Sequence, residues 1–392
     1  MKTMYLCLLA FALINLSCDQ ATVTIVPEKE VQLKSISNLT IETGMDMAQI
    51  NSVISSASSG QTVWVEPGTY VINGKLKFKN GITLKNVSST PVFDATGNTS
   101  RLLEMYYSSG FDNCVVDGIE FHNIRFRIAD AVNVQFVNCI FDHGVRMAGT
   151  DKKYLKDAYV HFLRVEEGLI DACTFSRREG NSGRGVYNAK STAVSITNNT
   201  FGDGGATGYF TTAINDNSAE SYIANNQVHR IESWVNKAET DHGMYCHSFH
   251  ALQIIGNTIS GWPADASGGA IKARNGDELL IQDNVMNTSG ILLYTYKHST
   301  QPYLNNVIVE NNFINVAGPA NDLYHGIGYW RNTPDGSELS IRIANNELSN
   351  GTIKASFGSL VVGDFNAAGG GVFNNDISTM NLKSGINQSG NY

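Results

Sequence analysis

A short polar motif recurs along this chain and constrains its fold more than any other feature. In each copy an apolar residue precedes a small polar pair and another apolar residue follows it, as in Ile196-Thr-Asn-Asn-Thr-Phe201. A repeat spacing of this size indicates a stacked array of similar structural units. The pairs end at Cys139, Cys173, Asn199, Asn226, Asn257, Asn284, Asn312, Asn346 and Asn375, with successive steps of 34, 26, 27, 31, 27, 28, 34 and 29 residues.

Each repeat unit carries short runs of alternating apolar residues and no helical apolar stripe, which indicates strands. Stacked coils place equivalent side chains above one another, and asparagine ladders hydrogen-bond well in that arrangement. The Leu-x-x-Leu-x-Leu pattern of leucine-rich repeats is absent. The sequence therefore predicts an all-β, single-domain, right-handed parallel β-helix.

The two ends of the predicted solenoid differ in sequence. Residues Ala48 to Ala57 are compatible with a short amphipathic helix, and a strand pattern with a Pro-Gly-Thr-Tyr turn follows between Gly60 and Val71. This combination resembles the N-terminal cap and first coil of pectin-lyase-like β-helix proteins. A cap is physically required because an open solenoid end exposes core and strand edges. Residues 380–392 are polar and are predicted to fray.

The N-terminal segment predicts export. Lys2 precedes an apolar stretch from Met4 to Leu16, which has the length of a signal peptide and is too short for a membrane span. The segment ending at Cys18 resembles a bacterial lipoprotein processing site, and ordinary signal cleavage is the alternative. We expect a signal peptide at 1–18, a tether at 19–35, a β-helix domain at 36–392, and a location at the cell surface, in the periplasm or outside the cell.

Composition excludes several classes of protein. Charged residues make up 16% of the chain and hydrophobic residues 42%, which is typical of a folded protein. The formal net charge of -8 argues against a nucleic-acid partner, and we expect a monomer. Outside the export segment, the cysteine spacing does not match a metal knuckle. Of the four cysteines Cys114, Cys139, Cys173 and Cys246, we expect the two at ladder positions, Cys139 and Cys173, to stack as small buried side chains with free thiols rather than to form a disulfide.

The polar pairs also set a register for the strand that precedes them. Counting back 12 and 10 residues from Asn257 gives Tyr245 and His247, and the same count from Asn284 gives Lys272 and Arg274. The residues between them are small or apolar, so alternation predicts that the two sets point to opposite sides of the strand. The outward set forms a strip that we call the cationic strip: Arg127, His161, Tyr187, Tyr245, His247, Lys272, Arg274, Tyr294 and Tyr296.

A basic strip on an acidic protein focuses anionic ligands, and aromatic rings offer stacking surface for sugars. We therefore expect an acidic polysaccharide as the partner. Lysine and tyrosine are also ordinary on a solvated strand face, which is the alternative for any single residue. Trp330 and Tyr324 are candidate walls for sugar subsites, or simple loop anchors.

The densest part of the strip resembles polysaccharide lyase family 6, which contains alginate lyases and chondroitin-B-type lyases. Arg274-Asn-Gly-Asp277 matches that family's arginine segment. The resemblance implies a calcium site in which Glu239 and Asp241 supply the acidic pair, with Asn215 or Asn217 as a further ligand. The chain departs from the family where a lysine base is expected, because Cys246 or His247 stands there.

The chemistry that this resemblance implies is β-elimination from a uronate. Removal of the C5 proton requires a base, and a cation must neutralise the carboxylate and stabilise the enolate-like state. His247 or Lys272 is the candidate base, Arg274 the carboxylate clamp, and Tyr245 or Tyr294 the acid. We expect neighbouring cations to favour neutral histidine and deprotonated tyrosine. Substrate-binding candidates are Arg127, His161, Tyr187, His242, Tyr294, Tyr296 and His325.

Three other functions stay open. Hydrolysis requires two carboxylates flanking the bond, for which Asp216 and Asp241 are candidates. A C5-epimerase would share the base and the clamp, although the Asp-Pro-His motif of the alginate enzymes is absent. The third is glycan binding without catalysis, as in a glycan-binding module or a surface adhesin.

Overall fold

The computed structural model describes residues 39–98, 102–144, 158–176, 183–202, 210–230, 242–262, 269–297, 301–317, 326–332 and 336–392. Residues Leu39–Tyr392 form one compact unit. The predicted signal peptide and tether, and the candidate site residues Glu239, Asp241, Tyr324 and His325, lie outside the described residues. Within the described part of the chain, no helix is long and apolar enough to cross a membrane.

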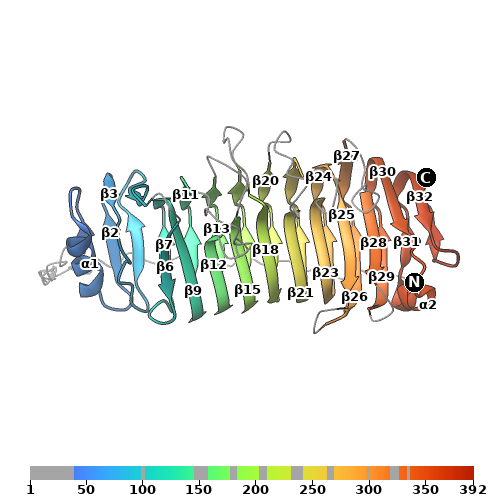
Figure 1. Ribbon diagram of the computed structural model, residues 1–392, viewed down its shortest axis with the longest axis horizontal. Helices are drawn as coiled ribbons and strands as arrows, with labels where there is room; N and C mark the ends of the chain where they lie inside the picture. The colour runs from blue at the N-terminus through green and yellow to red at the C-terminus, as the bar shows by residue number, and fades with distance from the viewer. Residues whose placement is uncertain are drawn as a thin grey trace, which may run out of the picture. The chain divides into compact units, whose positions relative to one another are not determined.

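The compact unit is a β-helix, as predicted. Successive coils add strands in parallel to the same three sheets, so the strands stand side by side in Figure 1. The first sheet contains β6 (Leu103–Tyr107), β9 (Ile124–Val132), β12 (Ala158–Glu166), β15 (Arg184–Thr192), β18 (Thr212–Ala219), the first half of β21 (His242–Ile255) and of β23 (Gly269–Gln282), β25 (Ile291–Tyr296) and β28 (Gly326–Asn332).

The other two sheets complete each coil. The second sheet contains β1 (Thr40–Ile41), β2 (Thr62–Val65), β4 (Thr83–Asn86), β7 (Val115–Asp117), β10 (Gln135–Val137), β13 (Leu169–Asp171), β16 (Ser195–Thr197), β19 (Tyr222–Ala224), the ends of β21 and β23, β26 (Tyr303–Glu310), β29 (Ser337–Ala344), β31 (Gly371–Phe373) and β33 (Gln388–Ser389). The third contains β3 (Thr69–Val71), β5 (Val92–Asp94), β8 (Glu120–His122), β11 (Ile140–Asp142), β14 (Thr174–Phe175), β17 (Thr200–Phe201), β20 (Gln227–His229), β22 (Thr258–Ser260), β24 (Val285–Thr288), β27 (Phe313–Val316) and the first parts of β30 (Glu347–Ala355) and β32 (Asp376–Leu382). The later residues of β30 pair with β28, and those of β32 pair with β30, so they continue the first sheet.

The asparagine ladder lies at the corner between the second and third sheets. The Asn226 backbone N–H donates to Asn257 Oδ1 at 2.9 Å, and Asn226 Nδ2 donates to the same oxygen at 2.9 Å. The Asn257 amide repeats this pattern towards Asn284. These side chains are fully buried, so each one supplies partners that the corner backbone would otherwise lack. The predicted ladder is confirmed.

The two cysteines at ladder positions continue the corner in its first coils. Cys139 and Cys173 are buried and free, and the Cys139 backbone N–H points at Cys173 Sγ over 3.4 Å. This confirms the expectation for Cys139 and Cys173. Cys114 and Cys246 are also buried free thiols.

Residues just before the ladder adopt a left-handed backbone conformation. Asn138, Asn198 and Asn225 have φ of 53°, 57° and 56°, which suits asparagine. Ala172 occupies the equivalent position with φ 51°. Repetition of this conformation from coil to coil gives the chain its sharp corners.

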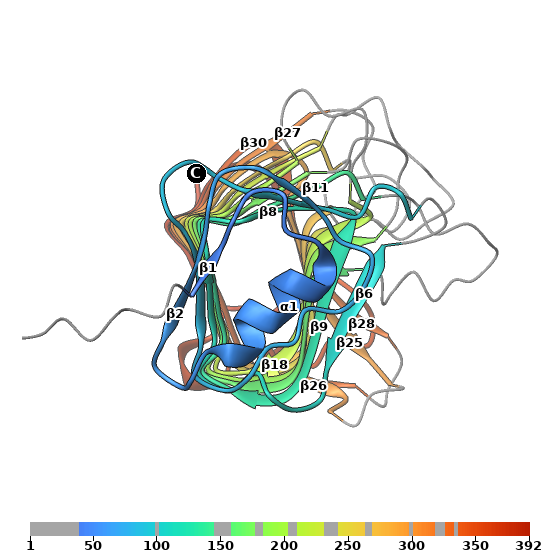
Figure 2. The ribbon, with the colours of Figure 1, turned by 90° about the vertical axis from the view of Figure 1, so that its left-hand side faces the viewer.

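Both ends of the solenoid are ordered. Helix α1 (Met47–Ser56) lies across the N-terminal opening (Figure 2), is capped by Asp46 and buries Ile50 and Ile54, as the amphipathic pattern predicted. The prediction that residues 380–392 fray is wrong. Asn391 Oδ1 accepts from the Asn375 backbone N–H at 3.0 Å, so the ladder continues to the end of the chain. Helix α2 (Val362–Phe365) and a 3-10 turn at Ala367–Gly369 lie near this end.

Candidate active site

The first sheet aligns the predicted strip residues in two register rows. In one row Arg127, His161, Tyr187, Asn215, Tyr245 and Lys272 are successive strand partners. In the other, His247, Arg274, Tyr294 and Trp330 are successive partners. The structure therefore aligns residues that are far apart in sequence, such as Arg127 and Lys272, in rows along one sheet.

Alternation along these strands separates the strip from the core. Met244, Cys246, Ile271 and Ala273 are fully buried in the main core, as the alternation predicted. Near the other end of the strip, two buried residues form a separate small apolar cluster together with two partly buried aromatic residues: Leu292, Tyr294, Tyr296 and Trp330. This cluster extends the aromatic surface of the strip and includes Trp330, which sequence analysis had proposed as a subsite wall.

Ring contacts join neighbouring strip residues. The rings of His161 and Tyr187 are stacked with centroids 4.6 Å apart. The Tyr245 ring lies 5.1 Å from the His247 ring and 5.1 Å from the His242 ring. The surface is therefore a packed row of aromatic rings rather than a set of independent side chains.

Two cations sit among these rings without a carboxylate partner. Lys272 Nζ lies 5.6 Å from the Tyr245 ring centroid and 4.9 Å from that of Tyr294. The Arg274 guanidinium carbon lies 5.3 Å from the Tyr245 ring centroid and 5.6 Å from that of Tyr296. Among the described residues neither cation forms an ion pair, and Arg274 Nε is buried without a hydrogen-bond partner. Cations held in this way favour an anionic ligand.

Burial and mutual repulsion shift the proton affinities of this cluster. Burial, followed by the charge of Arg274, lowers the pKa of Lys272 to about 8. Burial lowers the pKa of His247 to about 4, with further contributions from Arg274, Arg184 and Lys272. Burial, and then the charge of Lys272, also lowers the pKa of His242 well below its ordinary value. Neutral histidine is favoured here, as expected, although burial contributes more than charge.

The expectation for tyrosine is wrong at Tyr245. Burial raises the pKa of Tyr245 to about 12 and outweighs the opposing effects of Arg274 and Arg184. Its phenol therefore keeps its proton at neutral pH, because burial disfavours the phenolate more than the cations stabilise it.

Some predicted site residues are more enclosed than an outward strand face implies. His161 is 3% exposed and His242 is fully buried. Asn215 is also buried, and its Nδ2 donates to the Tyr245 backbone oxygen at 2.7 Å. Asn215 thus ties two coils of the strip together. Asn215 and Asn217 are the members of the predicted calcium set that lie among the described residues.

Asp216, one of the hydrolase candidates, faces the core. It is fully buried, its Oδ1 accepts from Asn188 Nδ2 at 2.6 Å and from Ser221 Oγ at 3.0 Å, and burial raises its pKa to about 6. Among the described residues, one strip residue forms an ion pair with a carboxylate. Arg127 Nη1 lies 3.9 Å from the Glu104 carboxylate.

Sequence analysis missed Arg184. This residue is 5% exposed, and its guanidinium carbon lies 5.1 Å from the Tyr187 ring centroid. Arg184 is the register partner of Thr212, which in turn is the register partner of His242. Arg184 precedes Tyr187 by three residues, as His242 precedes Tyr245. A third counted position, 15 residues before each ladder asparagine, would have identified it.

Solved structures similar to this chain share its fold. The surface adhesin PfbA of Streptococcus pneumoniae has 14% identity and a TM-score of 0.50, with 86% of each chain covered. The family 28 exopolygalacturonase of Yersinia enterocolitica has 12% identity and a TM-score of 0.51, covering 88% of this chain and 74% of that one. The catalytic domain of a GH87 α-1,3-glucanase has 12% identity and a TM-score of 0.46, covering 93% and 70%.

No family model matches the sequence, and no curated protein matches it. The chain has the right-handed parallel β-helix fold found in this exopolygalacturonase and in this surface adhesin.

Proposed function

We propose that this protein is an exported enzyme that cleaves an acidic, uronate-containing polysaccharide by β-elimination. The observation that carries the proposal is the pair Lys272 and Arg274, two cations held between tyrosine rings without a carboxylate partner among the described residues. A uronate carboxylate is an anion that would complete such a site. It is also the group beside which β-elimination removes a proton.

Arg274 is the proposed carboxylate clamp. Its guanidinium is planar and can bind both oxygens of a carboxylate at once. When the C5 proton leaves, negative charge spreads onto that carboxylate, so the interaction strengthens in the transition state. The Tyr245 and Tyr296 rings beside the guanidinium would hold it in place before substrate arrives.

Lys272 is the better candidate for the base. Its pKa of about 8 lies near neutral pH, and general bases act best when their pKa is close to the working pH. His247 is the alternative and is neutral over a wider range, but with a pKa of about 4 its imidazole is the weaker proton acceptor. Lys272 is the register partner of Tyr245, and His247 is the register partner of Arg274.

The leaving sugar oxygen requires a proton, and Tyr245 or Tyr294 would supply it. A pKa of about 12 keeps Tyr245 protonated, which suits a proton donor. Lys272 Nζ is close to both tyrosine rings, so base and acid would act on the same sugar unit. A C5-epimerase would use the same base and clamp without expelling the leaving group.

Hydrolysis has less support among the described residues. It requires two carboxylates on either side of the scissile bond, whereas Asp216 is buried in the core. The similar fold of an exopolygalacturonase keeps hydrolysis as an alternative, with Asp241 as its remaining sequence candidate.

Binding of an acidic glycan without cleavage is the second candidate function. The aromatic cluster around Tyr294 and Trp330 favours it, because stacked rings bind sugars without taking part in chemistry. The same fold also serves a surface adhesin.

Membership of polysaccharide lyase family 6 and binding of calcium are proposals. The resemblance to polysaccharide lyase family 6 rests on the segment Arg274–Asp277. Calcium binding by Asn215, Glu239 and Asp241 rests on that resemblance, and the steps above use no metal ion.

The decisive experiment is a screen of alginate, chondroitin, dermatan, heparin and pectin substrates with two readouts. Ultraviolet absorbance reports the unsaturated uronate of a lyase, and a reducing-sugar assay reports any cleavage. Absorbance with new reducing ends supports β-elimination. Reducing ends without absorbance identify a hydrolase, and binding without either product identifies a glycan-binding protein. Solvent deuterium incorporated at C5 without cleavage identifies an epimerase.

A further inference from the structure

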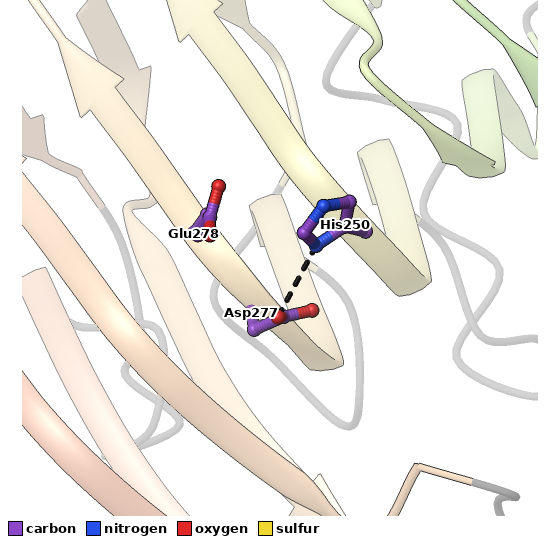
Figure 3. Close-up of side chains that lie close together, drawn as sticks. All are labelled: His250, Asp277 and Glu278. Carbon is purple, nitrogen blue, oxygen red and sulfur yellow. Dashed lines mark ion pairs between the residues drawn. The ribbon is translucent and has the colours of Figure 1, made fainter.

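Three potential metal ligands meet at the turn between the first and second sheets. His250 on β21 and Asp277 and Glu278 on β23 each offer a ligand atom, and these atoms all lie within 4.8 Å of one another. His250 Nδ1 is 3.2 Å from Asp277 Oδ2, the pair marked in Figure 3. Ligands about 2.0–2.2 Å from a tetrahedral zinc ion lie roughly 3.3–3.6 Å apart, so small rotations of these side chains bring them onto one ion.

The backbone holds these ligands in fixed positions. His250 and Asp277 are register partners in the longest strand pairing described, between β21 and β23. Ala251 and Glu278, the residues that follow them, both have left-handed φ values, of 51° and 57°. The turn is therefore repeated from one coil to the next, and the three side chains leave it from a rigid surface.

A neighbouring amide provides an independent observation. Asn305 on β26 is the register partner of Asp277 on the following coil. Its Oδ1 is shielded from solvent and accepts no hydrogen bond among the described residues. A shielded carbonyl oxygen without a donor is costly, and a cation beside Asp277 would give it a partner.

We propose that His250, Asp277 and Glu278, with Asn305 Oδ1 as a fourth ligand, form a site for a divalent transition-metal cation such as Zn²⁺. One imidazole nitrogen and two carboxylates make a mixed nitrogen and oxygen set, which zinc accepts readily. Calcium favours sets made of oxygen alone, so the histidine selects against it. This site differs in residues and in metal from the calcium site that the sequence suggested.

The site has a structural consequence for the cationic strip. His250 follows His247 by three residues on β21, and Asp277 follows Arg274 by three residues on β23. A bound ion would join these two strands just beyond the strip. The proposal concerns metal binding and does not depend on the proposed lyase activity.

The test is isothermal titration calorimetry of the untagged, metal-free protein, with Zn²⁺ in one experiment and Ca²⁺ in a parallel one. We expect one equivalent of zinc to bind and calcium to bind at least tenfold more weakly. His250→Ala and Asp277→Asn should each weaken zinc binding by at least tenfold, since even loss of an outer partner commonly weakens a metal site by about 10–100-fold. Both side chains are partly exposed, and circular dichroism checks that the variants fold.

A matched control separates this site from a second histidine and carboxylate group. His122 Nε2 lies 2.5 Å from Glu120 Oε1, and the His122 ring lies 4.1 Å from the His143 ring. His122→Ala should leave the zinc affinity unchanged. Zinc binding that survives both His250→Ala and Asp277→Asn, or that is lost in His122→Ala, would overturn the proposal, as would the absence of submillimolar zinc binding by the unmodified chain.

Discussion

Arg274 is the register partner of His247 on the preceding coil, so the guanidinium and the imidazole leave the same face of the first sheet. After burial, the charge of Arg274 is the largest cause of the low pKa of His247, and it also lowers the pKa of Lys272. One arginine therefore affects both candidate bases, and its removal should change binding and protonation together.

Replacing Arg274 with alanine should reduce kcat/KM on a confirmed uronate substrate by roughly 10²-fold or more, as for loss of one transition-state donor. Arg274→Lys should recover little, because a point charge cannot bind both carboxylate oxygens in the same way. Steady-state kinetics measure the effect. Arg342→Ala is the matched control, since Arg342 lies over the Phe373 ring on the second sheet. Unchanged activity in Arg274→Ala would remove this residue from the site.

The pH dependence should identify the base. A base must be deprotonated to act, so activity that depends on Lys272 rises with pH and has its midpoint near the Lys272 pKa of about 8. Because Arg274 lowers this pKa, residual activity in Arg274→Ala should have its midpoint at higher pH. A kcat/KM profile measures both. A rising limb near pH 4 would instead assign the base to His247.

Asp216→Ala should cost stability rather than activity. The substitution removes the acceptor for Asn188 Nδ2 and Ser221 Oγ in the core, and each unsatisfied buried group costs about 1–3 kcal/mol. Urea denaturation measures the loss, with the exposed Asp376→Ala as control. A normal unfolding midpoint combined with lost activity would restore Asp216 as a catalytic carboxylate.

Leucine at a ladder position should also destabilise the protein. Asn257→Leu removes the acceptor for the Asn226 backbone N–H and the donor to Asn284, so we expect a loss of about 1–3 kcal/mol. Thermal or urea unfolding tests this, and Asn381→Leu on the exposed end of β32 is the control. Equal stability of the two variants would mean that the ladder contributes nothing.

Ala172→Asn should stabilise the protein. Ala172 has a left-handed φ of 51°, which is unfavourable for alanine and tolerated by asparagine. On either side, Asn138 Nδ2 donates to Asp117 and Asn198 Nδ2 donates to Asp171. A gain of about 0.5–1 kcal/mol is expected, measured as a higher Tm. Ala172→Val should lower Tm, because a β-branched residue is strained there; a gain with valine would contradict the argument.

The coil register was predictable from sequence because the ladder repeats a buried, hydrogen-bonded position once per coil. Counting from it placed Lys272 and Arg274 correctly on one face. The same count does not protect against a slip of one residue, which reverses the direction of a side chain. Asp216 illustrates this slip. Counting back 10 residues from Asn226 gives Asp216, but Asp216 pairs with Cys246 and faces the core. Asn217, the next residue, has the position equivalent to His247.

Other features depend on quantities that the sequence does not display. The high pKa of Tyr245 results from enclosure by neighbouring coils, which outweighs nearby charge. The ordered C-terminus depends on Asn391, which extends the ladder only 16 residues after Asn375. This step is shorter than any of the earlier ones, so the repeat pattern did not reveal it.

The ladder also allows the number of coils in the solenoid to change by whole coils. Each asparagine bonds to the next coil through the same atoms, so one whole coil can be gained or lost without creating a new kind of contact. Such an event would lengthen or shorten the sheet that carries the cationic strip by one strand spacing, about 4.8 Å. If the strip binds a polysaccharide as proposed, the number of sugars that it contacts would change with each coil while the corner chemistry stays constant.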